Sequence, residues 1–280
     1  MSFILEYQSL IKRIDQAIEL PAIKQILLPD PTDSDDMKDN FGFVILSDGS
    51  AGPFYSCLGD TLTWLNEHRN HFIGQSPIKV AVKLDGLAIP ASALALGAFN
   101  AISQHIMKRA GFDPCAITKR SDTDLTAGHI GLVGFFGPLV ERYIAQGKQI
   151  TIIEQQPERV PADLPIQLYT SPEALAACDY ILCTASTLIN NTIESIVDAA
   201  GDPAKINLIG PSASGLPDLL FAMGIHSTGG FSVDNLDELI HSVLQGDSWG
   251  TSGRKYQLTR EVYPGVDLLL KQMRQNANQS

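Results

Sequence analysis

The sequence predicts an α/β protein in which a doubly wound parallel sheet follows a smaller α+β domain. From residue 128 onward, short apolar runs alternate with helical segments, which is typical of a parallel sheet covered on both faces. Of the 280 residues, 44% are apolar, enough to fill a sizeable core. A polar stretch without periodicity separates two parts of the chain. We therefore expect a first domain at 1–111, a linker at 112–127 and a second domain at 128–280.

The first part mixes helical and strand patterns. Apolar residues from 3 to 20 fall on one helical stripe that Pro21 ends. The runs "IKQILLPD", "FGFVILSD" and "AGPFYSC" predict strands, with Asp48-Gly49 as a hairpin turn, and "TLTWLNEHRNHF" predicts a helix.

A longer helical pattern extends from Gly86 to Gly111. Small Ala and Gly residues on its apolar side permit close approach, so we expect this helix to be buried between other elements. Its Asn100 would be a polar residue in apolar surroundings, and we favour the role of a core amide with hydrogen bonds inside the protein over that of a ligand contact. The same small-residue stripe could form a domain interface or an oligomer interface.

The second part reads as six strands with helices between them. The strands are predicted at "HIGLVGFF", "QITIIEQ", "IQLYT", "YILCTAS", "KINLIG" and "IHSTGGFSV". After Gly250 we expect one helix that returns over a face of the domain.

Composition excludes several classes of partner. The formal net charge is −11, so the average field repels nucleic acid and anionic membrane surfaces. The first residues lack a basic region followed by an apolar run, and no stretch approaches the roughly 20 apolar residues that span a bilayer. Four cysteines do not form a disulfide framework in a chain of this length. We expect a cytoplasmic protein with a small-molecule partner and no nucleic-acid or membrane partner.

Three strand ends share a chemistry of glycines, hydroxyls and amides. Because the carboxyl ends of parallel strands meet at one edge of a sheet, we expect these residues to line a common crevice. Each loop alone favours helix capping without a ligand, and their recurrence favours a bound small molecule. The residues are Gly134 and Phe135 after the first strand, Thr184, Ser186, Thr187, Asn190 and Thr192 after "YILC", and Gly210, Pro211 and Ser212 after "INLI".

Glu154 ends the second strand 23 residues after Gly131. A Rossmann domain keeps the acid that binds ribose hydroxyls at about this spacing. The glycines at 131, 134 and 137 have the spacing G-x-x-G-x-x-G, which lacks the dinucleotide fingerprint G-x-G-x-x-G. The glycine spacing therefore does not support NAD in its usual pose. The position of Glu154 leaves another nucleotide open, such as a methyl donor.

The segments "HIGLVGFFGPLVERYIAQGKQITIIEQQPE", "CTASTLINNTIES", "INLIGPSASGLPDLLFAMGIHSTGGFSV" and "LGAFNAISQH" resemble the family described as "putative heavy-metal chelation domain". The resemblance implies a first domain similar to the amino-terminal domain of enolases, a Rossmann-like second domain and a cleft between them. It also implies a pterin-like or other small ligand that helps to hold a heavy metal. Carried over by position, it falls on the strand-end residues named above, including Glu154.

Direct metal ligands are hard to find in the sequence. The spacing of Cys178 and Cys183 differs from paired zinc motifs and favours buried thiols. His68-x-x-His71 favours solvated histidines, His129 opens a strand, and His226 is a weak candidate near the crevice. The acidic run from Asp30 to Asp39 lacks the spacing of a calcium loop.

Two functions follow as hypotheses. The first is a small-molecule binding protein that handles a heavy metal through an organic ligand. The alternative is an enzyme that uses a nucleotide-type cofactor at the same cleft. No G-x-S-x-G, P-loop or H-E-x-x-H motif occurs, so the sequence names no catalytic residue. The metal, the cofactor and a possible homo-oligomer stay open.

Overall fold

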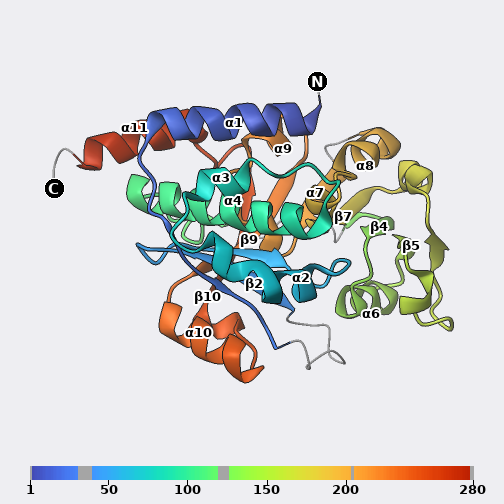
Figure 1. Cartoon of the computed structure of the whole chain (residues 1–280). Coiled ribbons are helices and arrows are strands. Elements are labelled where there is room, and N and C mark those ends of the chain that lie inside the picture. The colour runs from blue at the N-terminus through green and yellow to red at the C-terminus, as the bar shows by residue number, and fades with distance from the viewer. Residues whose placement is uncertain (1, 31–39, 119–125, 203–204, 278–280) are drawn as a thin grey trace.

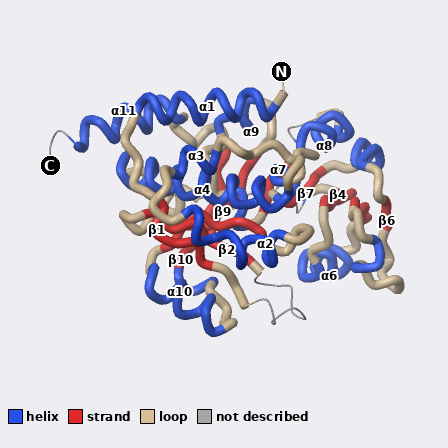
Figure 2. The backbone as a smooth tube through the Cα atoms, in the orientation of Figure 1, coloured by secondary structure: helices blue, strands red, loops and turns tan. Residues whose placement is uncertain are grey.

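A seven-stranded sheet forms the second part of the chain in the computed structural model, which describes residues 2–30, 40–118, 126–202 and 205–277 (Figures 1 and 2). Its order is β10-β9-β8-β7-β4-β5-β6, and every neighbouring pair is parallel except β10 with β9. The strands are β4 (His129–Val133), β5 (Gln149–Ile153), β6 (Gln167–Tyr169), β7 (Tyr180–Thr184), β8 (Ile206–Ile209), β9 (Ser227–Val233) and β10 (Gly253–Thr259).

The chain enters this sheet in its middle. From β4 it runs outward through β5 to β6, then returns to the other side of β4 and continues through β7, β8 and β9. Counted from β4, the six parallel strands have the order 3-2-1-4-5-6 of a doubly wound nucleotide-binding sheet. The predicted α/β class and mostly parallel sheet are confirmed.

Short helices connect the strands. The β6–β7 connection, expected as an α-helix, is the 3-10 helix η3. The helical elements of this part are α6 (Gly137–Ala145), η2 (Pro157–Arg159), η3 (Pro172–Ala177), α7 (Ser186–Ile189), α8 (Ile193–Ala200), η5 (Pro211–Ala213), α9 (Asp218–Ala222), α10 (Leu236–Gln245), η6 (Gly250–Ser252) and α11 (Val266–Ala277).

The expectation of a single helix after Gly250 is wrong for its first half. Residues Gly253–Thr259 form β10, which pairs antiparallel with β9, and only Val266–Ala277 is helical. Tyr256 and Leu258 are buried while Lys255 is exposed, which is the alternation of a half-buried strand. The alternation of buried and exposed residues in this strand is short, and the longer helical pattern at 266–277 led to the expectation of one helix.

The first part of the chain contains a separate three-stranded antiparallel sheet in the order β1-β2-β3. Its strands are β1 (Ile23–Leu27), β2 (Phe41–Leu46) and β3 (Ala51–Tyr55). The predicted hairpin joins β2 to β3, and Gly49 adopts a φ of 86° in its turn. Pro53 lies in β3, which is an edge strand of this sheet and so tolerates a residue without an N–H.

Among the described residues of the first part, four α-helices and one 3-10 helix accompany the small sheet. They are α1 (Phe3–Ala17), α2 (Thr61–His68), η1 (Arg69–Phe72), α3 (Pro77–Ala81) and α4 (Ile89–Ala110). Figure 1 shows α4 crossing the middle of the molecule, with α1 above it and the strands of the small sheet below. The likeness of this part to the amino-terminal domain of enolases stays a prediction.

Helix α4 packs directly on β3 through glycines. A Cβ added to Gly52 of β3 would lie 2.1 Å from the backbone nitrogen of Ala101 and 2.2 Å from the carbonyl oxygen of Gly97. A Cβ on Gly97 would lie 2.4 Å from the ring of Phe54. The small-residue stripe of α4 is therefore an intramolecular interface between helix and sheet.

Three buried polar residues of α4 bind the loop after β8. Asn100 Nδ2 donates to the carbonyl oxygens of Pro53 (2.7 Å) and Ser212 (2.9 Å). Ser103 Oγ accepts the N–H of Leu216 (3.0 Å), and Gln104 Nε2 donates to the carbonyl oxygen of Ser214 (3.0 Å). The amide nitrogen of Asn100 is thus bonded within the core, and these bonds join the small sheet to the loop after β8.

The two parts share one apolar core. A single cluster of buried side chains extends from Tyr7 of α1 through Ile102 of α4 to Leu208 of β8 and Leu269 of α11. In the expected linker, Phe112, Cys115 and Ile117 pack against this cluster, and residues 119–125 lie outside the described part. The domain bounds 1–111 and 128–280 stay a prediction.

Within the described residues, none of the helices combines the length and the apolar character needed to cross a bilayer.

We expect Gly52→Ala to lower the free energy of unfolding by about 3 kcal/mol or more, since the new methyl group would overlap the backbone of α4. Urea unfolding followed by circular dichroism measures the change. Gly250→Ala is the matched control, because its methyl group would meet no atom closer than 3.8 Å. Equal stability of the two variants would contradict the close packing of β3 on α4.

The turn of the β2–β3 hairpin is also tied to α4, through Asp48 and His105 at 2.7 Å. Burial would raise the pKa of Asp48, but hydrogen bonds from His105 and Ser50 lower it to about 2. A lowered carboxyl pKa stabilises the fold above the unfolded value near 4, and this stabilisation is lost as the pH falls toward 2.

Asp48→Asn should therefore cost about 1 kcal/mol at pH 7, allowing for partial exposure of the carboxylate. The difference in unfolding free energy between the parent and the variant should shrink between about pH 4 and pH 2. Urea titrations across that range measure it. A difference that does not vary with pH would contradict the stabilising pair.

Candidate functional site

The carboxyl ends of β4, β7 and β8 lie side by side at one edge of the large sheet. Val133 of β4 pairs with Cys183 of β7, and Thr184 of β7 pairs with Ile209 of β8. The direction of strand succession reverses between β4 and β7. Ligands of open α/β sheets bind outside the strand ends at such a point. The three loops selected from the sequence therefore leave the sheet from neighbouring strands.

Gly134 begins the first loop in a conformation that favours glycine, with a φ of 92°. Its N–H donates to the carbonyl oxygen of Ile153 (2.9 Å), which ties the loop to β5. An added Cβ would lie 3.3 Å from Cγ2 of Thr184, so the backbone also presses on the end of β7. The next residue, Phe135, is partly exposed.

Glu154 joins the loops after β4 and β5. Its Oε2 accepts the N–H of Phe135 (3.1 Å), and its Oε1 accepts the N–H of Gln156 (3.0 Å). A carboxylate can accept further bonds, because each oxygen has two lone pairs. The first role that the geometry gives Glu154 is to hold the loop after β4 in place.

The hydroxyls after β7 bond mainly to one another and to the local backbone. Thr184 Oγ1 accepts the N–H of Ser186 (3.3 Å) and donates to Ser186 Oγ (3.2 Å). Thr187 Oγ1 donates to the carbonyl oxygen of Thr184 (2.7 Å). These bonds stabilise the turn from β7 into α7 and explain why short polar residues follow a buried strand.

Asn190 and Thr192 form the second turn of this loop. Asn190 Oδ1 accepts the N–H of Thr192 (3.3 Å) and its hydroxyl (2.7 Å). Thr192 is the N-cap residue of α8, but its side chain makes no capping bond to the helix. The helix capping expected of the polar residues after this strand is therefore not made by the side chain of Thr192, whose hydroxyl bonds to Asn190 instead. Asn191, between them, has a φ of 55°.

The third loop combines an open glycine with a buried serine. Gly210 has φ 102° and ψ 160°, and an added Cβ would meet no atom within 4 Å. Pro211 opens η5. Ser212 is 2% exposed, and its Oγ accepts the N–H of Tyr55 (2.8 Å). Gly210 therefore borders free space, whereas the hydroxyl of Ser212 is already used to bind β3.

Residues at the end of β3 face the loop after β5, and local sequence patterns gave no signal for this. Arg159 of η2 forms a hydrogen bond with the hydroxyl of Tyr55 and lies close enough to Cys57 to act on its thiol. Burial raises the pKa of Tyr55, and the bond from Arg159 opposes that rise. Tyr55 and Cys57 of the first domain therefore face Arg159 of the loop after β5.

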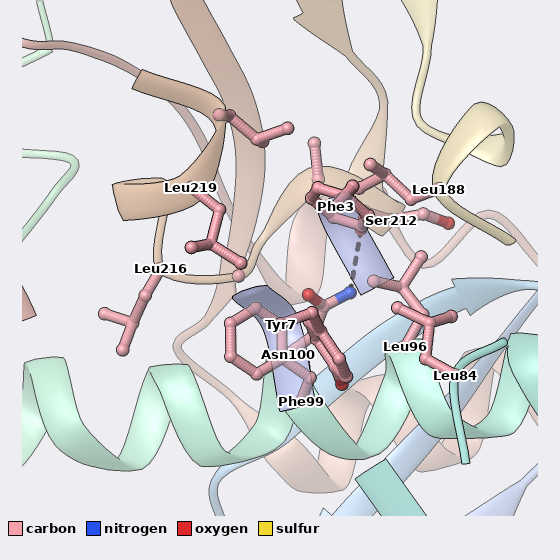
Figure 3. A pocket seen from close by; sticks show the side chains of 13 residues that line it. Phe3, Tyr7, Leu84, Leu96, Phe99, Asn100, Leu188, Ser212, Leu216 and Leu219 are labelled. Carbon is pink, nitrogen blue, oxygen red and sulfur yellow. Dashed lines mark hydrogen bonds between the residues drawn. The ribbon is translucent and has the colours of Figure 1, made fainter. Parts of the chain in front are cut away.

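A small cavity lies behind Ser212, between α1, α4 and the loop after β8 (Figure 3). Its volume is about 20 Å³, which is room for one water and far less than an organic ligand needs. Asn100 Oδ1 lines it and has no hydrogen-bond partner among the described residues. This cavity suits one structural water and cannot hold the predicted ligand.

Direct chelation of a heavy metal does not fit the strand-end site. Among the described residues, no three His, Cys, Asp or Glu side chains are grouped to hold an ion. Burial raises the pKa of Cys178 to about 11 and that of Cys183 to about 12. Both thiols are buried, and each makes a hydrogen bond to a neighbouring oxygen atom, the carbonyl oxygen of Ala174 for Cys178 and Oγ1 of Thr187 for Cys183. Residues 31–39 of the acidic run lie outside the described part.

Neither His129 nor His226 joins this site as a ligand. His129 Nε2 bonds to the hydroxyl of Thr151 (2.8 Å) at the amino end of β4, which is the opposite edge of the sheet. His226 precedes β9, and its N–H donates to the carbonyl oxygen of Ile206, the first residue of β8. His226 therefore also lies at the amino edge, away from the expected crevice.

Fold and site together define an α/β protein with a doubly wound sheet whose polar strand-end loops are held against a small antiparallel sheet. The family model DUF364, described as "Putative heavy-metal chelation", matches residues 120–261. The chain belongs to this family.

Solved structures of the same family share the fold. One, of unknown function, comes from Desulfitobacterium hafniense; it is 16% identical, with 90% of this chain and 97% of that chain covered and a TM-score of 0.63. Another, from Pyrococcus horikoshii, is 20% identical, with coverage of 89% and 97% and a TM-score of 0.64. An uncharacterized protein of Methanocaldococcus jannaschii is 25% identical over 215 residues, which are 73% of this chain and 82% of that protein.

We expect Glu154→Gln to loosen the loop after β4, because one backbone N–H would face an amide NH₂ in place of a carboxylate oxygen. The backbone amides of Phe135 and Gln156 should exchange hydrogen for deuterium several times faster than in the parent. Glu158→Gln, at an exposed position two residues past Gln156, is the control. Unchanged exchange in Glu154→Gln would contradict the positioning role.

Proposed function

We propose that this protein binds a small organic molecule at the carboxyl edge of its large sheet and handles a heavy metal through that molecule. The observation that carries the proposal is the adjacency of the ends of β4, β7 and β8 at the point where the strand order reverses. Three glycine- and hydroxyl-rich loops start there, and such an edge is the usual ligand site of this architecture.

Gly210 supports close approach by a ligand. Its φ of 102° and ψ of 160° are open only to glycine, and no protein atom would contact a side chain at this position. Packing therefore does not require a glycine here, but the backbone path does. A ligand can come against the main chain at 210 without meeting a side chain of that residue.

The chemistry around Gly210 fits a flat, polar, ring-containing ligand of the pterin type. Phe135 and Phe136 are partly exposed and can stack on a ring system. Ser186 Oγ is partly exposed and can bond to ring nitrogens or oxygens. Arg159, in η2 after β5, supplies positive charge in a chain whose net charge is −11. These groups favour a ligand with an electron-rich or anionic edge.

An organic ligand also accounts for the family description better than bare side chains do. The thiols of Cys178 and Cys183 are buried, and no three candidate ligands gather among the described residues. Nitrogen and oxygen atoms of a bound heterocycle would supply the donors that the strand-end loops lack. In this proposal the protein binds and orients the chelator, and it need not contribute a metal ligand.

The strand order and the position of Glu154 favour a second candidate, an enzyme with a nucleotide-type cofactor such as a methyl donor. Glu154 ends the second parallel strand, as the ribose-binding acid does in Rossmann domains. Here its oxygens accept two backbone N–H groups, which is a positioning role. A Glu154→Gln protein that keeps its ligand but loses a measured turnover would favour the enzyme.

We expect native mass spectrometry of freshly purified protein to show an extra mass of a small organic molecule that is released on denaturation. Ser186→Ala should retain it about 3- to 10-fold more weakly, which corresponds to one lost hydrogen bond. Ser195→Ala is the matched control, because Ser195 is exposed and bonds only to the carbonyl oxygen of Thr192 among the contacts described.

The same measurement can overturn the proposal. The parent protein should be measured as purified and again after incubation with a small-molecule extract of cells that naturally contain it. If it shows only the polypeptide mass in both samples, the site does not bind such a molecule. Equal retention by Ser186→Ala and the parent would remove the loop after β7 from the site.

A further inference from the structure

Two histidines of the first domain lie close together on the surface, away from the strand-end loops. His68 is the last residue of the α-helix α2, and His71 lies in the 3-10 helix η1 that follows; residues three apart share a face in either kind of helix. Their ring centroids are 6.0 Å apart, and the ring planes are tilted by 35°.

Hydrogen bonds fix the same tautomer in both rings. His68 Nδ1 lies 2.8 Å from the carbonyl oxygen of Trp64, and His71 Nδ1 lies 3.1 Å from the carbonyl oxygen of His68. A carbonyl oxygen can only accept, so each Nδ1 carries the proton. Each neutral ring therefore presents the lone pair of Nε2. Metal-binding histidines commonly have the same arrangement, in which the ring nitrogen that does not face the metal donates to a carbonyl oxygen.

The surroundings hold the His68 ring and leave the His71 ring accessible. His68 is stacked on the indole of Trp64, with ring centroids 4.6 Å apart and an interplanar angle of 14°. His71 is exposed to solvent. One ligand is therefore oriented before an ion arrives, and the other can adjust by rotation of its side chain.

We propose that His68 and His71 form a two-nitrogen chelate site for a divalent ion of the Cu²⁺, Ni²⁺ or Zn²⁺ type, with water in the remaining positions. With metal–nitrogen distances of about 2.0–2.1 Å, two imidazoles on one ion have centroids roughly 5–6 Å apart. The observed centroid separation of 6.0 Å lies at the upper end of this range. Imidazole nitrogen suits these ions, whereas Mg²⁺ and Ca²⁺ take oxygen ligands. The site is independent of the function proposed for the strand-end loops.

The stack of His68 on Trp64 provides a built-in reporter. Cu²⁺ or Ni²⁺ held by His68 would lie within a few ångströms of the indole and quench its fluorescence. The chain has two tryptophans, and the other, Trp249, is buried in a separate apolar cluster with Phe43 and Phe231. The metal-dependent change in emission should therefore come from Trp64 alone.

The test is a titration of the metal-free full chain with NiSO₄, ZnCl₂, CuCl₂ and MgCl₂, followed by calorimetry and tryptophan fluorescence. We expect one equivalent to bind with a micromolar Kd, tightest for Cu²⁺, while Mg²⁺ has no effect. His71→Asn should weaken binding at least tenfold. His241→Asn, which replaces another exposed helical histidine, should bind like the parent. All four cysteines are present in each protein, so the difference isolates the histidines.

Two results would overturn the site. One is equal binding of Ni²⁺ by the parent and by the double variant His68→Asn with His71→Asn. The other is a parent chain that binds none of the three transition ions at 100-fold excess. Trp64→Phe should keep the calorimetric signal and lose the quenching; quenching that persists would place the ion elsewhere. Because only metal ions are added, failure here leaves the mass measurement of the organic ligand unaffected.

Discussion

Hydrogen bonds from buried side chains of α4 to the loop after β8 hold the two sheets of this protein in their arrangement. Asn100, Ser103 and Gln104 project from one buried helix, and their bonds reach the backbone of residues 212–216. An unpaired carbonyl or N–H in such a core costs about 1–3 kcal/mol, so the loop has little freedom to move. The same amide of Asn100 also holds Pro53, which fixes β3 against that loop.

This constraint is what brings the candidate site together. Once β3 is held on α4, the N–H of Tyr55 meets Ser212, and the end of β3 lies opposite the loop after β5. The strand-end loops are therefore anchored from both sides, by pairing within the large sheet and by hydrogen bonds to the first domain. A ligand at this edge would contact residues of both parts of the chain without requiring either part to move.

Local patterns predicted much of the fold and less of the site. The alternation of apolar strands with short helices identified six parallel strands, because strands covered on both faces are apolar throughout. Polar strand ends identified the loops around Gly134, Thr184 and Gly210. The role of Ser212 could not be predicted in the same way, because its partner, Tyr55, lies 157 positions away. The two backbone N–H groups that donate to Glu154 could not be predicted from the sequence either, because they depend on how the loops after β4 and β5 pack together.

The two edge strands of the large sheet also limit aggregation between copies of the protein. Its last strand at one side, β6, has only three residues, and two of them are exposed. A strand of another molecule would find few free N–H and C=O groups there with which to extend the sheet. At the opposite border the antiparallel β10 is further shielded, since the N–H of Gln257 donates to the hydroxyl of Thr118. Both borders thus resist edge-to-edge aggregation.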